Sequence, residues 1–523
     1  MRSSESQGLN GKLAESASRG WVDRQLGALT PRQKLAQRLV ALPGITNDGR
    51  PDQATRAALA AGLGVLHGLT GVSVSGAARY HVEVAETGAE RALPPTLVAA
   101  NLESGIGYTL GDGGTHFPYP RGIGHSDDAD LARRLAEDAG REARLVGFHW
   151  TFSPCIDVLT ERDDPILGVR AFGVDPRRTG VLGAAQVRGY QDGGLLATAK
   201  HFPGHGDSPT DTHAALATLP RRPEAHERVH MPPFEEAVAA GVASVMVAHV
   251  ALPGLGVDGP ASLSPVVNRT WLRGELAYEG VIVTDSLRMG AIARSVGTAD
   301  AAVAALAAGA DVANVKCSAD EIPAVLDALE EALWAGVLDH EELDRSVERL
   351  LRARARLGLH RGHGIDLERC AELDAGEPWR QEGLARTVST WSRPHLPGPA
   401  VVVGDSSLAR LVAERLSSRG KQVLYEPAPV DTGSLSSVAR KHPDATIVAV
   451  TCPLPAEGGR DSAAFACTVH SLRAEGRPVV AVVNSAVPAA ELRVGGPAVS
   501  VPAVDAFGVV SRASVAAVVE ALR

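Results

Sequence analysis

The stretch Gly194-Leu-Leu-Ala-Thr-Ala-Lys-His-Phe-Pro-Gly-His-Gly-Asp-Ser-Pro-Thr-Asp-Thr-His213 decides how the chain is organised. It begins with an apolar run opened by glycine, which predicts a buried strand that ends at Ala199, directly before Lys200 and His201. The prolines and glycines that follow interrupt regular structure and predict a loop. Loops on a rigid scaffold commonly carry chemistry, and this one combines lysine, histidine and carboxylates. We therefore interpret it as a functional loop rather than as polar surface.

Short apolar runs alternate with amphipathic segments on both sides of this stretch. The apolar runs predict strands at 64–67, 96–100, 147–151, 195–199, 243–248, 280–284 and 310–313. The amphipathic segments predict helices at 31–41, with Thr30 as N-cap, and at 128–145, 176–190, 224–240 and 300–308. Strict alternation implies parallel strands with right-handed crossovers. About eight such units predict a catalytic (β/α)8 TIM-like barrel over residues 25–360.

A second, smaller alternation follows the barrel. A charged amphipathic helix is predicted at 339–359, and a linker at 361–397 with one helix near 378–390. Strands are then predicted at 400–403, 422–425, 446–450, 479–483 and 499–501, with helices such as 408–419 and 463–475 between them. These parallel strands predict a doubly wound αβα sandwich domain over 398–523. Because it has no G-x-G-x-x-G motif, we interpret it as a packing domain without a dinucleotide site.

Length and composition restrict the class of protein. At 523 residues the chain exceeds what one core normally serves, and residues 1–24 form a polar segment before the barrel. The net charge of −9 and the absence of a basic stripe argue against a nucleic-acid partner. The five cysteines form no C-x-x-C pair, which argues against a disulfide framework and a zinc site. Without a secretory signal or a run of about 18 apolar residues, we expect a cytoplasmic protein with no membrane partner and leave its oligomeric state open.

Polar residues follow five of the predicted barrel strands. In such barrels, functional residues gather at the carboxyl ends of the strands. Each position also has a structural alternative, since Glu103 can close a salt bridge, Asp157 can cap a loop and His249 can be a satisfied core histidine. The strand-end residues are Asn101 and Glu103, Asp157, Lys200 with His201, His249, and Asp285.

Asp285 is the strongest of these candidates. It directly follows the β-forming run Val281-Ile-Val-Thr284 and so should lie at the mouth of the barrel. The structural alternative is an N-cap at the turn from strand to helix, because aspartate is a favoured cap. A carboxylate that faces a histidine-rich loop is the arrangement expected of a nucleophile with a proton donor opposite it.

Several motifs together resemble glycoside hydrolase family 3, and more narrowly its β-N-acetylglucosaminidase (β-hexosaminidase) branch. They occur in the order expected for that family over about residues 25–360. The segments that carry the resemblance are Gly114-Thr-His-Phe-Pro118, Val169-Arg-Ala-Phe-Gly173, Lys200-His-Phe-Pro-Gly-His-Gly-Asp207, Asp211-Thr-His213, Met246-Val-Ala-His249 and Val283-Thr-Asp-Ser286.

The resemblance implies a catalytic role for three residues. Asp285 would attack the anomeric carbon, His213 would transfer the proton as acid/base, and Asp211 would orient His213. Retaining glycosidases ordinarily use two carboxylates, so a histidine donor is unusual. Imidazole nevertheless titrates close to neutral pH, which makes it a suitable proton donor there. No metal and no cofactor are implied.

The resemblance also implies a set of residues that bind a small carbohydrate. Arg170, Lys200, His201 and Asn101 would hold the hydroxyls of the sugar next to the nucleophile. Lysine is scarce, at six of the 52 basic residues, so a lysine here is not expected by chance.

Two departures from the family pattern concern this binding set. Asn101-Leu-Glu-Ser-Gly105 stands where many relatives carry Asp-Gln-Glu-Gly-Gly, which changes the charge of the position but keeps its hydrogen-bonding capacity. Asp164-Pro stands where the family has Asn-Pro, and the arginine of that subsite is kept as Arg170.

The activity implied is that of a retaining exo-β-N-acetylglucosaminidase that releases terminal β-linked N-acetylglucosamine through a glycosyl-aspartate intermediate. A β-glycoside phosphorylase or β-glucosidase of the same family is the alternative, because an imidazole donor leaves less negative charge near an incoming phosphate than a carboxylate would.

A metal-dependent barrel hydrolase would leave the Asp285 segment unexplained, and a non-catalytic sugar-binding protein would be expected to lack Asp285 or His213. The metal ligands would be His201, His205, Asp207, Asp211 and His213.

Overall fold

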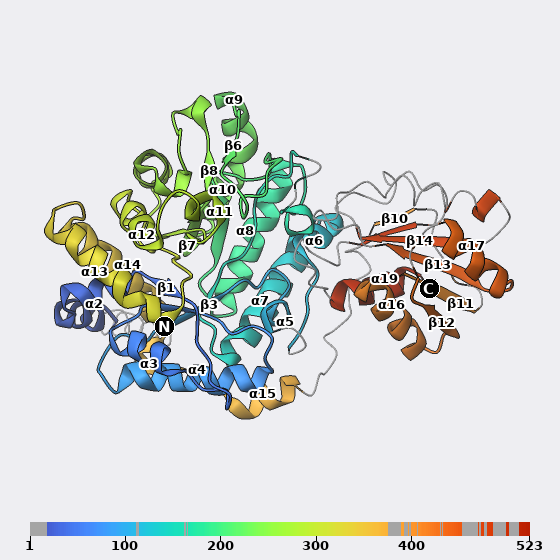
Figure 1. Cartoon of the computed structure of the whole chain (residues 1–523), viewed down its shortest axis with the longest axis horizontal. Helices are drawn as coiled ribbons and strands as arrows, with labels where there is room; N and C mark the ends of the chain where they lie inside the picture. Colours follow the sequence, from blue (N-terminus) through green and yellow to red (C-terminus); the bar gives the residue numbers. More distant parts are fainter. Residues whose placement is uncertain are drawn as a thin grey trace, which may run out of the picture.

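The computed structural model describes residues 18–374, except 111–113, 162, 163 and 165 (Figure 1). In the C-terminal part it describes residues 389–391, 396, 399–404, 406–428, 430, 432–451, 469, 472–474, 478–484, 498–501 and 512–522. None of the helices in these ranges is both long and apolar enough to cross a lipid bilayer.

Parallel strands form the centre of the first part. They belong to two hydrogen-bonded sheets, β1-β2-β3-β4 and β5-β7-β9. The short apolar runs predicted from the sequence account for most of them. Their bounds are β1 Val40–Ala41, β2 Val65–His67, β3 Leu97–Ala100, β4 Trp150–Thr151, β5 Thr198–Phe202, β7 Ser244–Val247 and β9 Val281–Thr284.

Single backbone pairings close these two sheets into a barrel. Trp150 of β4 pairs with Leu196, just before β5, and Val283 of β9 pairs with Val312. Ala313 then pairs with Leu39, just before β1. The segment 312–313 therefore occupies the eighth position between β9 and β1, and the predicted (β/α)8 barrel is confirmed.

Helices lie between successive strands and surround the barrel (Figure 1). Asp128 and Asp175 cap α7 and α8 by accepting hydrogen bonds from backbone N–H groups of the first turn. The helices are α2 Pro31–Ala36, α3 Gln53–Ala60, α4 Val74–Ala89, α5 Ile106–Leu110, α6 Pro120–Ser126, α7 Ala129–Val146, α8 Pro176–Asp192, α9 Pro223–Ala225, α10 Pro232–Ala239, α11 Gly290–Ala293, α12 Thr298–Ala307, α13 Ile322–Trp334 and α14 His340–Arg356.

Two of the predicted helices are wrong in part. The segment 31–41 begins as a helix with Thr30 as N-cap, but α2 ends at Ala36 and Val40–Ala41 is strand β1. Pairing with β2 decides the conformation here, because tertiary contacts override a helical pattern in so short a segment. The segment 224–240 is broken by a π-helical turn, η2 His226–His230, before α10 begins.

Strand β5 extends further than predicted. It runs to Phe202, so Lys200 and His201 lie inside the strand and not after its end. The prediction ended the strand too early because charged residues are rare in buried strands. Here the backbone keeps Lys200 in the barrel wall, since the N–H of Ile156 donates to Lys200 O at 2.8 Å.

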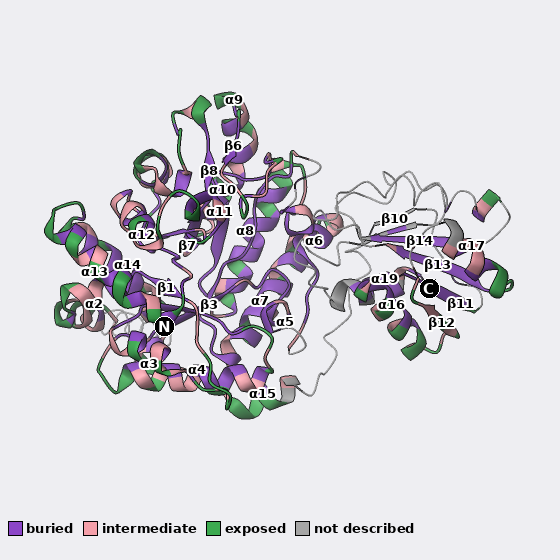
Figure 2. Ribbon diagram, viewed as in Figure 1, coloured by how far each residue is buried: buried purple, intermediate pink, exposed green. Residues whose placement is uncertain are grey.

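The barrel interior is packed with apolar side chains below the mouth. Val40, Val65 and Leu97 from neighbouring strands meet Trp150 there, and all four are fully buried. The indole Nε1–H of Trp150 lies 2.8 Å from Thr198 Oγ1, so its polar atom is satisfied inside the core. Figure 2 shows the buried strands at the centre and exposed residues on the outer faces of the helices.

The C-terminal part contains the predicted αβα sandwich. Its sheet has the order β10-β15-β14-β13-β11-β12, in which the five predicted strands are parallel. Apolar residues on both faces of this sheet pack against α16 Ser407–Ser418, α17 Thr432–Lys441 and α19 Arg512–Ala521. The strands are β10 Ser389–Trp391, β11 Ala400–Val403, β12 Val423–Glu426, β13 Thr446–Thr451, β14 Val479–Asn484 and β15 Ala498–Val501.

The region predicted as a linker at 361–397 contains regular structure. Helix α15, Leu367–Asp374, packs on the barrel, where the buried Cys370 contacts Leu145 O through its Sγ at 3.3 Å. The end of the predicted helix 378–390 is wrong, because residues 389–391 form β10, which pairs antiparallel with β15. The rest of that helix and most of the one predicted at 463–475 lie outside the described residues.

Candidate active site

A cavity of about 560 Å³ opens at the carboxyl ends of the barrel strands. Side chains that follow strands far apart in the sequence meet in it, as expected for this fold. The cavity contains every predicted site residue except Asp211, which lies behind one of them. Those that line it are Asn101, Arg170, Lys200, His201, His213 and Asp285.

Asp285 lies at the end of β9. Its backbone N–H donates to Val247 O at 2.9 Å, and its Oδ1 accepts from the Ser286 N–H at 2.7 Å. Burial would raise the pKa of Asp285, but His201, His249, the Ser286 N–H and Lys200 outweigh burial and hold it well below its usual range. No described helix begins at this residue, since α11 starts at Gly290, so the N-cap alternative is wrong.

A fully buried carboxylate supports the cationic wall of the cavity. Glu103 Oε1 accepts hydrogen bonds from Lys200 Nζ at 2.7 Å and from Arg170 Nη2 at 2.9 Å. Burial alone would raise the pKa of Glu103, but the two cations lower it to about 2. Lys200 Nζ also donates to Asn101 Oδ1 at 3.1 Å, so the asparagine keeps the hydrogen-bonding capacity expected of it. The salt-bridge alternative for Glu103 is therefore confirmed.

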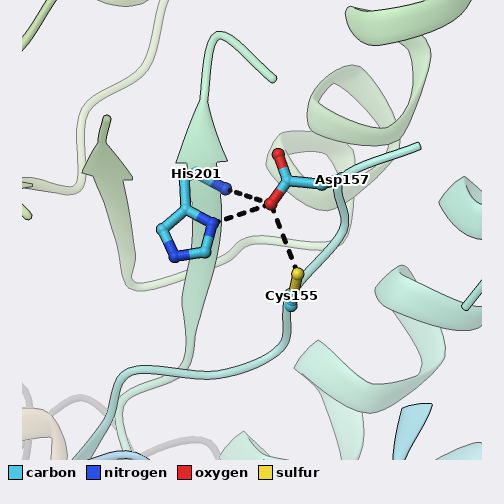
Figure 3. Close-up of side chains that lie close together, drawn as sticks. All are labelled: Cys155, Asp157 and His201. Carbon is cyan, nitrogen blue, oxygen red and sulfur yellow. Dashed lines mark hydrogen bonds and ion pairs between the residues drawn. The ribbon is translucent and has the colours of Figure 1, made fainter. Parts of the chain in front are cut away.

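Asp157 positions the histidine of this wall. Its Oδ2 accepts from the backbone N–H of His201 at 3.0 Å and lies 2.7 Å from His201 Nδ1 (Figure 3). Burial lowers the pKa of His201 although Asp157 opposes the shift. A neutral His201 that donates through Nδ1 to the carboxylate has an acceptor at Nε2, which suits a sugar hydroxyl.

His249 is a buried histidine whose two ring nitrogens both have hydrogen-bond partners, which confirms the structural alternative given for it. Its Nε2 lies 2.9 Å from the Ser286 carbonyl oxygen and therefore donates, while Nδ1 accepts from Ser262 Oγ at 2.7 Å. The ring thus supports the backbone next to Asp285 from behind.

The base of the functional loop is held by one buried arginine. Arg221 donates to Pro203 O at 2.8 Å and Gly204 O at 2.9 Å, and it forms a two-pronged ion pair with Asp207. Gly206 packs so closely that a Cβ there would lie 1.9 Å from Val158 O. This part of the loop is fixed in place and leaves little room for substitution.

The tip of the loop carries Asp211 and His213. Asp211 Oδ1 lies 2.9 Å from His213 Nδ1 and accepts from the His213 backbone N–H at 2.8 Å. Their side chains are 46% and 42% exposed. The N–H of Gly290 donates to His213 O at 2.9 Å, which ties the tip to the segment after β9.

The ligand set considered for a metal is not gathered at one point. Asp207 pairs with Arg221, and Asp211 pairs with His213. Among the described residues, Cys155, Asp157 and His201 do have ligand atoms within 4.8 Å of one another (Figure 3). Burial raises the pKa of the Cys155 thiol well above its usual range, and Asp157 already binds His201, so this set fits a hydrogen-bond cluster better than a cation.

Sequence reasoning missed part of the lining. Lys316 and Asn314 follow the eighth strand position, His67 ends β2, and Tyr108 lies on α5. The signal for Lys316 was available, since it is one of only six lysines and follows an apolar run that predicts a strand. Asp285 was found because it is a polar residue that follows a predicted strand, and the same criterion applies to Lys316.

The arrangement suits acyl or glycosyl transfer through a covalent intermediate. An ionised carboxylate with a depressed pKa is a nucleophile, and an imidazole oriented by a second carboxylate is a general acid and base. Both line one cavity, together with donors and acceptors for several hydroxyls.

Comparison with known proteins agrees with this chemistry. Beta-N-acetylglucosaminidase/beta-glucosidase from Cellulomonas fimi is 33% identical over 287 residues, which are 53% of this chain and 50% of that protein. Beta-hexosaminidase LpqI from Mycobacterium tuberculosis is 36% identical over 329 residues, which are 62% of this chain and 82% of that protein.

A solved structure resembles both parts of the chain. The glycoside hydrolase family 3 beta-N-acetylglucosaminidase from Paenibacillus sp. str. FPU-7 superposes with a TM-score of 0.79 at 28% identity, covering 94% of this chain and 96% of that one. The sequence model of the Glycosyl hydrolase family 3 N terminal domain matches residues 71–353, which are more than half of the chain and hold every cavity-lining residue named above except His67. The chain therefore belongs to glycoside hydrolase family 3.

Proposed function

We propose that the chain is a retaining exo-β-N-acetylglucosaminidase that removes terminal β-linked N-acetylglucosamine from oligosaccharides or cell-wall fragments. The observation that carries this proposal is the meeting of ionised Asp285 in one cavity with His213, whose ring Asp211 holds from behind. The choice of sugar is supported by the names of the beta-hexosaminidase from Mycobacterium tuberculosis and the beta-N-acetylglucosaminidase from Paenibacillus. Fragments released during peptidoglycan recycling in the cytoplasm are the substrate source that we infer.

The first step forms the intermediate. A carboxylate oxygen of Asp285 attacks the anomeric carbon while the bond from that carbon to the aglycone oxygen breaks. His213 gives its proton to the leaving oxygen, which carries away the electron pair of the broken bond. Asp211 stabilises the imidazolium before transfer and holds the ring orientation.

The second step releases the sugar. His213, now neutral, takes a proton from water as the water oxygen attacks the anomeric carbon, and the bond to Asp285 breaks. Two inversions at the same carbon retain the β configuration. Arg170, Lys200, His201 and Asn101 would hold the sugar hydroxyls throughout, because all four line the same cavity as Asp285.

Phosphorolysis is the second candidate. The proton-transfer group is an imidazole and not a carboxylate, so a phosphate anion meets less repulsion at the position of the attacking water. In that case the phosphate oxygen would attack the anomeric carbon and the product would be a sugar 1-phosphate.

Initial rates on p-nitrophenyl β-glycosides test the proposal. N-acetylglucosaminide is expected to be cleaved faster than glucoside, with free sugar as the product in the presence and absence of phosphate. Accumulation of sugar 1-phosphate would favour the phosphorylase, and faster cleavage of glucoside would overturn the choice of sugar. EDTA is expected to leave the rate unchanged, whereas loss on chelation and recovery with zinc would favour the metal-dependent hydrolase.

A further inference from the structure

Lys316 occupies a fixed position at the mouth of the barrel. It follows the eighth strand position, and its backbone N–H donates to Val40 O at 2.9 Å. On either side of it, the N–H of Leu42 donates to Cys317 O at 2.8 Å and the N–H of Leu287 donates to Asn314 O at 2.9 Å. The backbone of this segment is therefore tied to both neighbouring strands, although Lys316 has a φ of +44°.

The side chain of Lys316 lines the cavity without a partner. Within the part of the chain that the structure describes, its ammonium group makes no hydrogen bond and no ion pair. The other cations that line the cavity differ, since Arg170 and Lys200 bind Glu103 and Arg288 binds Glu321. Lys316 is thus a cation whose hydrogen bonds are left for something that enters the cavity.

Its surroundings make a bound acceptor favourable. The side chain is partly buried, and burial lowers the pKa of Lys316 while Asp285 opposes the shift. An ammonium group has three donors and no acceptor, so it needs acceptor atoms, and on a sugar these are oxygens. A ligand oxygen would restore the hydrogen bonds that burial removes.

The order of the strands tells which part of a sugar this oxygen belongs to. Val283, two residues before Asp285, pairs with Val312, so Lys316 follows the strand position adjacent to that of the nucleophile. Lys200 lies on β5, two strands from β9 on the other side, because β7 is between them. In a pyranose, the anomeric carbon is bonded to C2 on one side and to the ring oxygen on the other, and C5 beyond that oxygen carries C6. With the anomeric carbon at Asp285, the substituents at C2 and C6 would extend toward these two sides.

We propose that Lys316 is a substrate-recognition residue that binds the oxygen of the C2 or the C6 substituent of the bound sugar. The inference rests on the proposed function, because it needs the anomeric carbon at Asp285. It adds a contact on the wall formed by β9, the eighth strand position and β1, opposite the wall that carries Asn101, Arg170 and Lys200. The acetamido carbonyl at C2 and the hydroxyl at C6 are the two sources of the same acceptor oxygen.

Three sugars distinguish the two sources by binding alone. N-acetylglucosamine carries both substituents, glucose lacks the acetamido group, and 2-acetamido-2,6-dideoxyglucose lacks the C6 hydroxyl. Calorimetric titration measures their dissociation constants with wild-type protein and with Lys316→Met, which keeps the length of the side chain and removes its donors. Lys34→Met is the matched control, because Lys34 pairs with Asp344 on the outside of the barrel.

Lys316→Met is expected to weaken N-acetylglucosamine binding by roughly 10- to 100-fold, the usual size of a hydrogen bond to a charged group. The variant should leave the dissociation constant of one of the two analogues unchanged. If that analogue is glucose, Lys316 binds the C2 acetamido group, and if it is 2-acetamido-2,6-dideoxyglucose, Lys316 binds the C6 hydroxyl. An equal loss for all three sugars, no loss for any of them, or no sugar binding by the wild type would overturn the inference. The titration measures binding and needs no turnover. If the wild-type protein binds the sugars but cleaves no β-glycoside, the proposed function is overturned and the inference about Lys316 is not.

Discussion

Two carboxylates support the groups that face the cavity, and their surroundings are opposite. Glu103 is fully buried and binds Lys200 and Arg170 at 2.7 and 2.9 Å. Asp211 is 46% exposed at the tip of a loop and binds His213 at 2.9 Å. The distances are alike, so solvent and not geometry separates the two pairs.

This difference fits two different tasks. A wall that only holds the sugar gains from dry surroundings, because charges and hydrogen bonds act more strongly where water is excluded. A group that gives a proton in one step and takes one in the next benefits from contact with water. We therefore interpret the Glu103 wall as the binding half of the site and the loop tip as the proton-transfer half.

The largest effect is expected from Asp285→Ala, because both halves act on the carbon that Asp285 attacks. This change removes the oxygen that attacks the anomeric carbon, so kcat on p-nitrophenyl N-acetyl-β-glucosaminide should fall roughly 10⁴- to 10⁶-fold. Azide should restore part of the rate by attacking from the vacated side, which gives an α-glycosyl azide that NMR identifies. A rate close to that of the wild type would end the assignment of the nucleophile.

His213→Ala tests the exposed half. A p-nitrophenolate leaves without a proton, whereas a sugar aglycone needs one, so the two substrates should be affected unequally. The loss in kcat/KM should be about 10²- to 10⁴-fold larger for a disaccharide than for the aryl glycoside. Equal losses on both substrates would mean that His213 only positions the sugar.

Glu103→Gln and Asp211→Asn form a matched pair, because each replaces a supporting carboxylate by an amide. Breaking the buried ion pairs of Glu103 should lower the free energy of unfolding by about 3–5 kcal/mol. The exposed pair of Asp211 should contribute less than about 1 kcal/mol. Urea denaturation of the two variants and the wild type measures both, and equal losses would remove the contrast between the two regions.

The effect of Glu103 on stability should also depend on pH with a definite sign. Its pKa is about 2 in the folded chain, below its ordinary value of 4.5. A depressed pKa contributes stability that is present above 4.5 and is lost as the pH falls toward 2. The difference in unfolding free energy between wild type and Glu103→Gln should therefore shrink between pH 5 and pH 2. A constant difference over this range would show that the charge of Glu103 is not the cause.

The barrel could be predicted from the sequence because its strands are short apolar runs between amphipathic helices. The two-residue strand β1 could not, since Val40 and Ala41 continue the pattern of α2 and only pairing with β2 decides their conformation. Strand β10 was missed for a similar reason, because its partner β15 lies more than 100 residues later in the chain.

The candidate site was predictable where a polar residue follows a barrel strand, because functional residues gather at the carboxyl ends of the strands. This rule found Asp285 and would have found Lys316. The pairing of Glu103 with Arg170 and Lys200 was not predictable as geometry, because 67 and 97 residues separate the partners in sequence. Only the closed barrel brings them to one buried point.

Asp211→Ala should give the smallest effect on activity, and its pattern is more informative than its size. Asp211 Oδ1 accepts both the His213 backbone N–H and the ring Nδ1–H, so it fixes which ring nitrogen faces the cavity. Without it the imidazole remains but loses its orientation, and kcat/KM on a disaccharide should fall roughly 10- to 100-fold.

The aryl glycoside should be affected much less, as in His213→Ala. Asp211→Asn is the control, because its amide oxygen still accepts both hydrogen bonds while the charge is gone. If Asp211→Asn keeps most of the rate, orientation is the main contribution of Asp211. If Asp211→Asn loses as much activity as Asp211→Ala, the main contribution of Asp211 is the negative charge that stabilises the imidazolium. An equal loss on aryl and sugar aglycones in both variants would contradict a role in proton transfer and would leave Asp211 as a residue that shapes the loop.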